Sequence, residues 1–437
     1  AAVAQAGVPH GSREGGWLPD LVYTGEKFES GLAFFADANG RLTRFSREPA
    51  DLTAARRLEG QAALPGLVNA HSHAWHRALR GRAESLDRAL AGLGDEEVFD
   101  TARMVFLEML TAGITCVGEF HFLRARPDGS PWPEPHHLVA EIIRAAHEVG
   151  LRIALLNTAC EDTVPGRCRH AGAEAWVREM EALRGVVEKN YLADEVWLGA
   201  GVHALGALPP DQLKAIAGHA RAQRLRLHAH VAVATAAGRT PLAELAELGF
   251  LDKRFTAVDA GQLGDEEVKL LGTARALVCA CPGGSLAAGQ GVAPVEKLLA
   301  AGAGVALGTD THARTDLIGE ARLLELLLRG ATGRRSALAA PALFHAATVG
   351  GARSLGATGG ALEVGRPADF FTVNLHDPSI AGADAASLLA ALVFGFERRA
   401  IRDVWIGGRQ RIAAGRHVMH GPIIGRFADG QKKLWGG

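Results

Sequence analysis

The 437-residue sequence has almost no net charge, because its 47 lysine and arginine residues are balanced by 48 aspartate and glutamate residues. A basic face that could bind nucleic-acid phosphates is therefore not expected. Long hydrophobic runs are also missing, since Gly, Pro or a charged residue interrupts each apolar stretch well before the roughly 20 residues of a membrane-spanning helix. These two absences argue against nucleic acid as a partner and against insertion into a membrane.

Cysteine is scarce as well, with five residues in the whole chain. This small, odd number in a large protein fits reduced thiols and a cytoplasmic location better than a disulfide framework. Cys279 and Cys281 form a C-x-C pair, but they lie in an apolar run, which favours a buried strand over a metal site there. The 48% hydrophobic and 22% charged residues indicate a globular protein, long enough for more than one domain.

Short apolar runs alternate with longer amphipathic segments from residue 66 to about residue 307. This alternation is typical of βα units that build a parallel sheet. Segments 100–112 and 138–149 carry apolar residues at helical spacing and are predicted to be outer helices. The predicted strands are residues 67–70, 114–119, 153–156, 196–202, 225–230, 256–260, 276–280 and 304–308. A set of about eight such strands predicts an α/β fold of the (β/α)8 barrel type.

The two ends of the chain have a different pattern. Residues 21–45, 368–373 and 403–412 contain strand-like runs, and turn signals accompany the first and the last of these segments. We therefore expect a small β domain built from both chain ends. Its predicted limits are residues 1–63 and 360–437, with the barrel formed by residues 64–359.

Two histidines directly follow the first predicted strand, in the sequence His71-Ser72-His73. Side chains two residues apart in an extended chain point to the same side, and the carboxyl ends of barrel strands surround the active site. His230 ends the fifth predicted strand and Asp310 follows the eighth. Imidazole nitrogen and carboxylate oxygen are ligands for zinc or ferrous iron, and such a site can activate water. The four residues together predict a metal site, whereas H-x-H alone could be two ordinary loop histidines.

Several motifs resemble those of a known family. Residues 64–73 (LPGLVNAHSH), His230, residues 308–310 (GTD) and residues 365–370 (GRPADF) resemble the metal-dependent amidohydrolase superfamily. Residues 69–78 (NAHSHAWHRA), 119–122 (EFHF) and 309–312 (TDTH) resemble the formimidoylglutamate deiminases within it. The resemblance extends from about residue 15 to about residue 420. It implies a distorted (β/α)8 TIM barrel with a small β-sandwich domain made from both chain ends.

The resemblance also implies a chemistry. One divalent metal ion, zinc or iron, would be held by His71, His73, His230 and Asp310. A metal-bound hydroxide would attack a C–N bond of a small-molecule substrate, and Asp310 would accept the proton of the water. The family resemblance further favours a homodimer.

The sequence departs from the deaminase pattern at several positions. The glutamate of the H-x-x-E pattern is replaced by Val233, and the histidine after strand six by Asp259, a carboxylate that would repel the hydroxide unless protonated or bound to metal. Gly206 stands where the deiminases have an arginine for the substrate carboxylates, Phe122 replaces a tyrosine, and His76 replaces a glutamine. We therefore do not expect formimidoylglutamate to be the substrate.

Two main hypotheses remain. The first is a working C–N hydrolase with a changed proton relay, and it is supported by the complete set of four metal ligands. The second is a catalytically inactive homologue that serves as a binding or scaffold subunit, and it is supported by the joint loss of two proton-handling residues and the substrate arginine. Another metal-dependent reaction, such as a lyase or isomerase step, is a third alternative. The candidate catalytic residues are Asp310, Asp259 and His312, and the candidate substrate-binding residues are His76, His121, Phe122 and His203.

Overall fold

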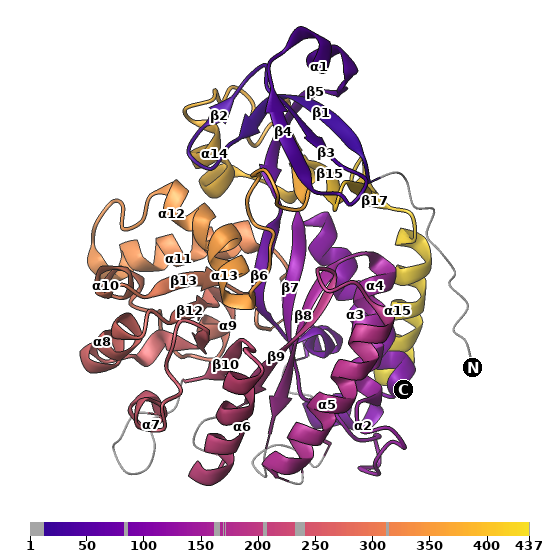
Figure 1. Cartoon of the computed structure of the whole chain (residues 1–437), viewed down its shortest axis with the longest axis vertical. Coiled ribbons are helices and arrows are strands. Elements are labelled where there is room, and N and C mark those ends of the chain that lie inside the picture. Colours follow the sequence, from indigo (N-terminus) through magenta and orange to yellow (C-terminus); the bar gives the residue numbers. More distant parts are fainter. Residues whose placement is uncertain are drawn as a thin grey trace.

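The computed structural model describes residues 13–82, 86–160, 167–168, 170, 172–203, 208–231, 241–311 and 314–436 (Figure 1). Its larger part is a sheet of eight parallel strands in which each strand pairs with the next along the chain. The strands are β6 (Leu67–Ser72), β7 (Ile114–His121), β8 (Arg152–Ala159), β9 (Val196–Val202), β10 (Leu227–His230), β11 (Phe255–Val258), β12 (Leu277–Ala280) and β13 (Gly304–Leu307). Every predicted barrel strand overlaps one of these, so the predicted TIM barrel is confirmed.

The first and last strands of this sheet meet at a short seam. The backbone amides of Thr309 and Asp310 donate to the carbonyl oxygen of His71, at 3.0 and 3.1 Å. The buried Asn69 side chain spans the same seam, accepting from the Thr309 amide at 3.1 Å and donating to the Thr309 hydroxyl at 2.8 Å. The closure of the barrel therefore places two of the predicted metal ligands, His71 and Asp310, on adjacent chain segments.

Helices connect the strands and cover the outside of the barrel (Figure 1). The two predicted outer helices are confirmed as α3 (Asp95–Thr111) and α4 (His137–Val149), and each buries the apolar residues of its helical stripe, such as Phe106 in α3 and Ile142 in α4. The other helices along the barrel are α2 (Leu86–Gly92), α5 (Ala173–Asn190), α6 (Pro210–Ala222), α7 (Pro241–Glu247), α8 (Asp265–Thr273), α9 (Pro282–Ala287), α10 (Val295–Ala301), α11 (Leu317–Thr332), α12 (Ala340–His345) and α13 (Gly351–Leu355). Short helical turns are η1 (Ala74–Leu79), η3 (Ala260–Gln262) and the π-helical η4 (Ala346–Gly350).

A second sheet of nine strands combines both ends of the chain, as expected, and lies at the top of the view in Figure 1. Its order is β17-β16-β15-β14-β5-β1-β3-β4, with β2 paired to β1, and the C-terminal strand β14 is antiparallel to the N-terminal strand β5. The elements are β1 (Gly15–Tyr23), β2 (Phe28–Glu29), β3 (Ala33–Ala36), β4 (Leu42–Ser46), α1 (Pro49–Ala54), β5 (Arg56–Pro65), β14 (Phe370–Asn374), α14 (Leu388–Gly395), η5 (Arg398–Ala400), β15 (Ile401–Ile406), β16 (Arg409–Ala413) and β17 (Arg416–His417). Trp17, Phe34, Phe370 and Trp405 form its aromatic core.

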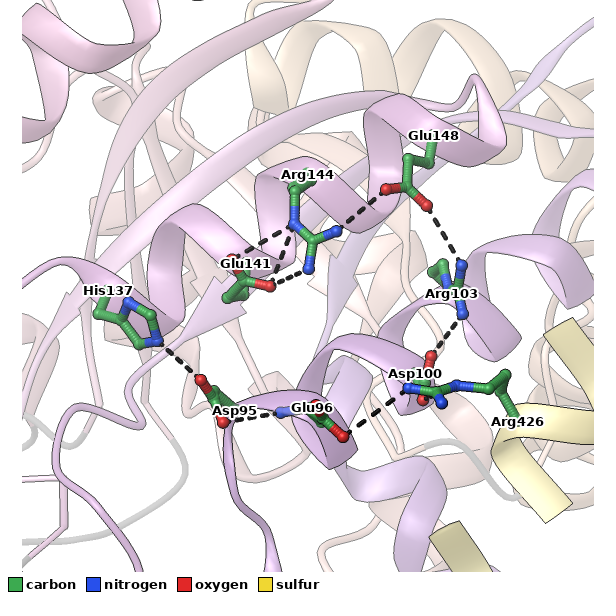
Figure 2. Close-up of polar contacts among 9 residues, drawn as sticks. All are labelled: Asp95, Glu96, Asp100, Arg103, His137, Glu141, Arg144, Glu148 and Arg426. Atoms are coloured by element: carbon green, nitrogen blue, oxygen red, sulfur yellow. Dashed lines mark hydrogen bonds and ion pairs between the residues drawn. The ribbon is translucent and has the colours of Figure 1, made fainter. Parts of the chain in front are cut away.

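The last helix, α15 (His420–Trp435), lies against the barrel helix α3 rather than on the second sheet. Arg426 of α15 contacts Asp100 and Glu96 of α3, at 3.1 and 3.8 Å, and Arg103 continues this charged network to Glu148 of α4 (Figure 2). The predicted domain limits, residues 1–63 with 360–437 and residues 64–359, stay a prediction. Helix α15 belongs to the first of these units but packs against the second. Among the described residues, no helix is both long enough and apolar enough to cross a membrane.

Candidate metal centre

Four side chains from three distant parts of the sequence meet at the carboxyl end of the barrel. They are His71, His73, His230 and Asp310, and one nitrogen or oxygen atom from each lies within 4.8 Å of the others. The Nε2 atoms of His71 and His73 are 3.1 Å apart, and the Asp310 Oδ1 atom lies 3.3 Å from His73 Nε2 and 3.7 Å from His71 Nε2. The structure therefore brings together the four residues that the sequence analysis predicted as metal ligands.

The protonation of these groups suits a divalent cation. Burial lowers the pKa of His71 well below its usual value, and the neighbouring His73 and His230 lower that pKa further. Burial alone would raise the pKa of Asp310, but the three imidazoles around the carboxylate lower it below its usual range. At neutral pH the group thus contains a neutral imidazole at His71 and an ionised carboxylate at Asp310, which are the forms that bind metal.

Hydrogen bonds at the far sides of the rings favour the same interpretation. Because a carbonyl oxygen can only accept, the contact of 2.9 Å between His73 Nδ1 and the Phe120 oxygen assigns a proton to Nδ1, so that Nε2 is the nitrogen available as a metal ligand. The buried Nε2 atom of His230 has no hydrogen-bond partner among the described residues. A metal ion between these rings would provide that partner, so the residues present fit such an ion.

The segment that carries His71 and His73 is held by Glu119, a buried residue of β7. Its two carboxyl oxygens accept hydrogen bonds from the Ser72 hydroxyl at 2.7 Å and from the Ala74 amide at 2.6 Å, one residue on each side of His73. Burial raises the pKa of Glu119 to about 8. The sequence analysis noted Glu119 only as part of a family motif and missed this role. A glutamate in the middle of an apolar strand was the signal that could have indicated a buried polar partner.

We expect the Glu119→Ala variant to lose about 1–3 kcal/mol of unfolding free energy for each buried group left without a partner. The Glu119→Gln variant should lose less, because its amide oxygen still accepts one of the two hydrogen bonds. Urea denaturation followed by circular dichroism measures both changes. Equal stability of Glu119→Ala and the unmodified protein would contradict the supporting role of this carboxylate.

Three of the predicted substrate-binding side chains lie beside the predicted metal ligands. The ring of His76 is 4.8 Å from the ring of His73, and that of Phe122 is 5.5 Å from it, measured between centroids. His203 lies between Phe122 and His230, at centroid distances of 4.6 and 5.9 Å. These rings therefore lie next to His73 and His230, and their role in substrate binding stays a prediction.

The remaining candidates have other surroundings. His121 is fully buried and donates from Nε2 to the carbonyl oxygen of Leu123 at 3.0 Å, and burial lowers its pKa to about 3. Asp259 contacts the His230 ring rather than standing alone in the site. His312, Val233 and Gly206 lie outside the described residues.

Residues 62–411, which include all four side chains of the metal centre, match the model of the amidohydrolase family. The chain belongs to the amidohydrolase family. Formimidoylglutamate deiminase of Pseudomonas aeruginosa is 31% identical to this amidohydrolase, over 90% of this chain and 93% of the relative. A 5-methylthioadenosine/S-adenosylhomocysteine deaminase of Moorella thermoacetica is 30% identical, over 81% of this chain and 82% of the relative. The family resemblance that the motifs indicated is thus confirmed.

Solved structures support the fold of this amidohydrolase. An amidohydrolase from Brucella melitensis superposes with a TM-score of 0.85 at 23% identity, covering 96% of this chain and 99% of that chain. An adenosine deaminase from Xanthomonas campestris with bound zinc superposes with a TM-score of 0.83 at 22% identity, covering 96% and 98%. At this level of identity the likeness shows the shared barrel architecture.

Proposed function

We propose that this amidohydrolase hydrolyses a C–N bond of a small molecule, in the manner of a deaminase, with one zinc ion held by His71, His73, His230 and Asp310. The observation that carries the proposal is the convergence of these four side chains at the carboxyl end of the barrel, where TIM-barrel enzymes have their active sites. The relatives named as deiminase and deaminase support the reaction class. When bound, a divalent ion supplies Lewis acidity that makes water a stronger nucleophile.

Asp310 is the proposed proton acceptor for the attacking water. Its carboxylate is ionised, lies 3.3 Å from His73 Nε2, and is therefore beside the ligand atoms where the nucleophile must bind. Its position depends on the close approach of Gly284, because a Cβ atom at residue 284 would come within 2.4 Å of Asp310 Oδ2. Any larger residue at this position would displace the carboxylate.

The proposed substrate is not formimidoylglutamate. A substrate with two carboxylates needs cationic partners, and a bidentate arginine is the usual one. Arg77, which follows the histidine pair, is instead paired with Glu108 through two contacts of 2.9 Å, and Arg124, which follows β7, is paired with Glu179. These two described arginines are thus occupied by protein carboxylates. We therefore propose a substrate without such a carboxylate pair, such as an amine, amidine or lactam.

One observation favours the alternative of a catalytically inactive homologue. Protonation of the leaving group requires an acid that carries a proton at neutral pH. Burial lowers the pKa of both His121 and His203 to about 3, so neither of these candidates is protonated there. In this alternative the metal centre would be structural and the protein would bind a partner or ligand without turnover.

The metal content of the protein purified without chelator, measured by elemental mass spectrometry, tests the proposal first. We expect about one zinc ion per chain, as in mononuclear catalytic sites. Amines, amidines and lactams should then be screened for ammonia release or ring opening, with Asp310→Asn as the matched control. Loss of a general base usually costs about 10²- to 10⁴-fold in rate. Folded protein with no bound metal would refute the proposal, and metal without turnover of any of these classes would favour the inactive homologue.

A further inference from the structure

Asp259 makes a direct contact with one of the proposed metal ligands. It follows the last residue of β11, and in the parallel ladder the preceding Val258 lies opposite His230 of β10. The Asp259 Oδ2 atom accepts a hydrogen bond from the His230 Nδ1 atom, and both side chains are largely buried. The backbone of Asp259 is left-handed, with φ of 60°, a conformation that aspartate tolerates better than most residues. The chain thus turns at this point so that the carboxylate reaches the neighbouring strand.

This hydrogen bond fixes which nitrogen of the neutral His230 ring carries the proton. With the Asp259 carboxylate oxygen as acceptor, Nδ1 donates, and in the neutral imidazole Nε2 then presents its lone pair. Nε2 is the buried atom without a partner among the described residues, and His230 is one of the four residues whose ligand atoms converge. The contact therefore selects the tautomer and the ring orientation that a metal ion at this centre requires.

The three histidines differ in how their orientation is secured. His73 donates from Nδ1 to the backbone carbonyl of Phe120, whereas His71 Nδ1 has no partner among the described residues. For His230, the acceptor of the described Nδ1 hydrogen bond is a side chain, that of Asp259, and not the backbone. A single side-chain substitution can therefore remove this bond, whereas the acceptor for His73 is part of the main chain.

The contact with His230 also bears on the electrostatics of the centre, because an acidic residue beside a ligand histidine favours a bound divalent cation. The repulsion of a nucleophile that the sequence analysis expected at Asp259 is reduced, because the carboxylate is bound to the His230 N–H. This explains in electrostatic terms why an acidic residue can stand here.

From these contacts we propose that Asp259 is a positioning residue, which fixes the Nδ1-protonated tautomer of His230 for metal binding, and not the proton donor to the leaving group. The inference rests on the proposed metal centre, because it needs His230 to be a ligand. It replaces the catalytic role that the sequence analysis gave to Asp259.

The test compares the zinc affinity of the unmodified protein with that of Asp259→Ala and Asp259→Asn, by competition with a fluorescent zinc chelator. We expect Asp259→Ala to bind zinc about 10- to 100-fold more weakly, the usual effect of removing such an outer partner. Asp259→Asn should recover most of the affinity, because its amide oxygen still accepts from Nδ1. Asp265→Ala is the matched control, since it removes one negative charge from the exposed start of the next helix, where Asp265 pairs with Lys297. Its affinity should be unchanged.

The outcomes separate this inference from the proposed function. Weaker zinc binding by Asp259→Ala, with recovery in Asp259→Asn and folded protein by circular dichroism in all variants, would support it. If Asp259→Ala binds zinc as tightly as the unmodified protein does, the positioning role is refuted and the proposed metal centre is left intact. Unmodified protein that binds no zinc would refute the proposed function and this inference together. If Asp259→Ala does not fold, the zinc affinity of Asp259→Asn is compared with that of Asp265→Ala. Loss of zinc binding in Asp259→Asn alone would then contradict the tautomer argument.

Discussion

Replacement of His230 by alanine should reduce the bound metal from about one ion per chain to a small fraction of that value, while the barrel stays folded. His230 ends β10, and its Nε2 atom belongs to the four converging ligand atoms. Two histidines and one carboxylate would remain, so the ion would lose one of four protein bonds and exchange rapidly with solvent. Elemental mass spectrometry after gel filtration measures the metal content, and circular dichroism measures the fold.

The matched control for this variant is His228→Gln, in the same short strand. His228 is fully buried, but its Nε2 atom contacts the carbonyl oxygen of Ser354 at 3.2 Å rather than the metal centre. Glutamine can place an amide N–H near the same carbonyl, so the control should keep its metal even if it is somewhat less stable. Metal retained at the unmodified level in His230→Ala would show that the ligand assignment is wrong. Metal lost equally from both variants would point to damage of β10 instead.

The sequence was most informative about the barrel and its carboxyl end. Buried parallel strands are nearly continuous apolar runs, so the run ending at Leu307 could be recognised without any knowledge of its neighbours. Residues that end such runs, as His230 does, must lie at one end of the barrel whatever the details of packing. The predicted metal ligands therefore depended only on strand order and direction, which short βα connections determine.

The sequence was least informative about contacts between side chains of different strands. Glu119 and Ser72 are 47 positions apart, and their hydrogen bond depends on the register of β6 against β7. The hydrogen bond that His230 donates to Asp259 depends on the left-handed turn at residue 259, which the sequence alone does not reveal. Spacing could place Asp259 near the candidate metal centre, but it could not show that its carboxylate contacts the His230 ring.

Breaking the buried ion pair between Arg152 and Asp369 should have the largest effect on stability of all the contacts described above. Arg152 begins β8 at the end of the barrel away from the metal centre, and Asp369 directly precedes β14 of the second sheet. Two hydrogen bonds of 2.7 and 3.1 Å join the guanidinium to the carboxylate, and the residues are only 4% and 1% exposed. The pair therefore connects the two sheets without contact with water.

Asp369→Ala should lower the unfolding free energy by about 3–5 kcal/mol, because the buried Arg152 guanidinium keeps only the more distant Asp194 carboxylate, at 3.4 Å, as an ionic partner. It also removes the acceptor of the Gly407 amide, which donates to Asp369 at 2.6 Å. Guanidinium chloride denaturation followed by tryptophan fluorescence measures the change. The matched control is Arg426→Ala on α15, whose side chain is 58% exposed and should contribute no more than about 1 kcal/mol.

The double variant Arg152→Met with Asp369→Leu separates the cost of an unpaired charge from the value of the pair itself. Apolar side chains of similar size need no desolvation of charge, so this variant should recover most of the stability that Asp369→Ala loses. Full recovery of the unfolding free energy would mean that the ion pair determines the relative orientation of the two sheets and adds no net stability. A double variant as unstable as Asp369→Ala would show instead that other hydrogen bonds of these two residues stabilise the contact between the sheets. These are the bond from Arg152 to the Asp194 carbonyl, at 2.6 Å, and the bond from the Gly407 amide to Asp369. Metal content should be the same in all of these variants, because the pair lies at the opposite end of the barrel from His71 and Asp310.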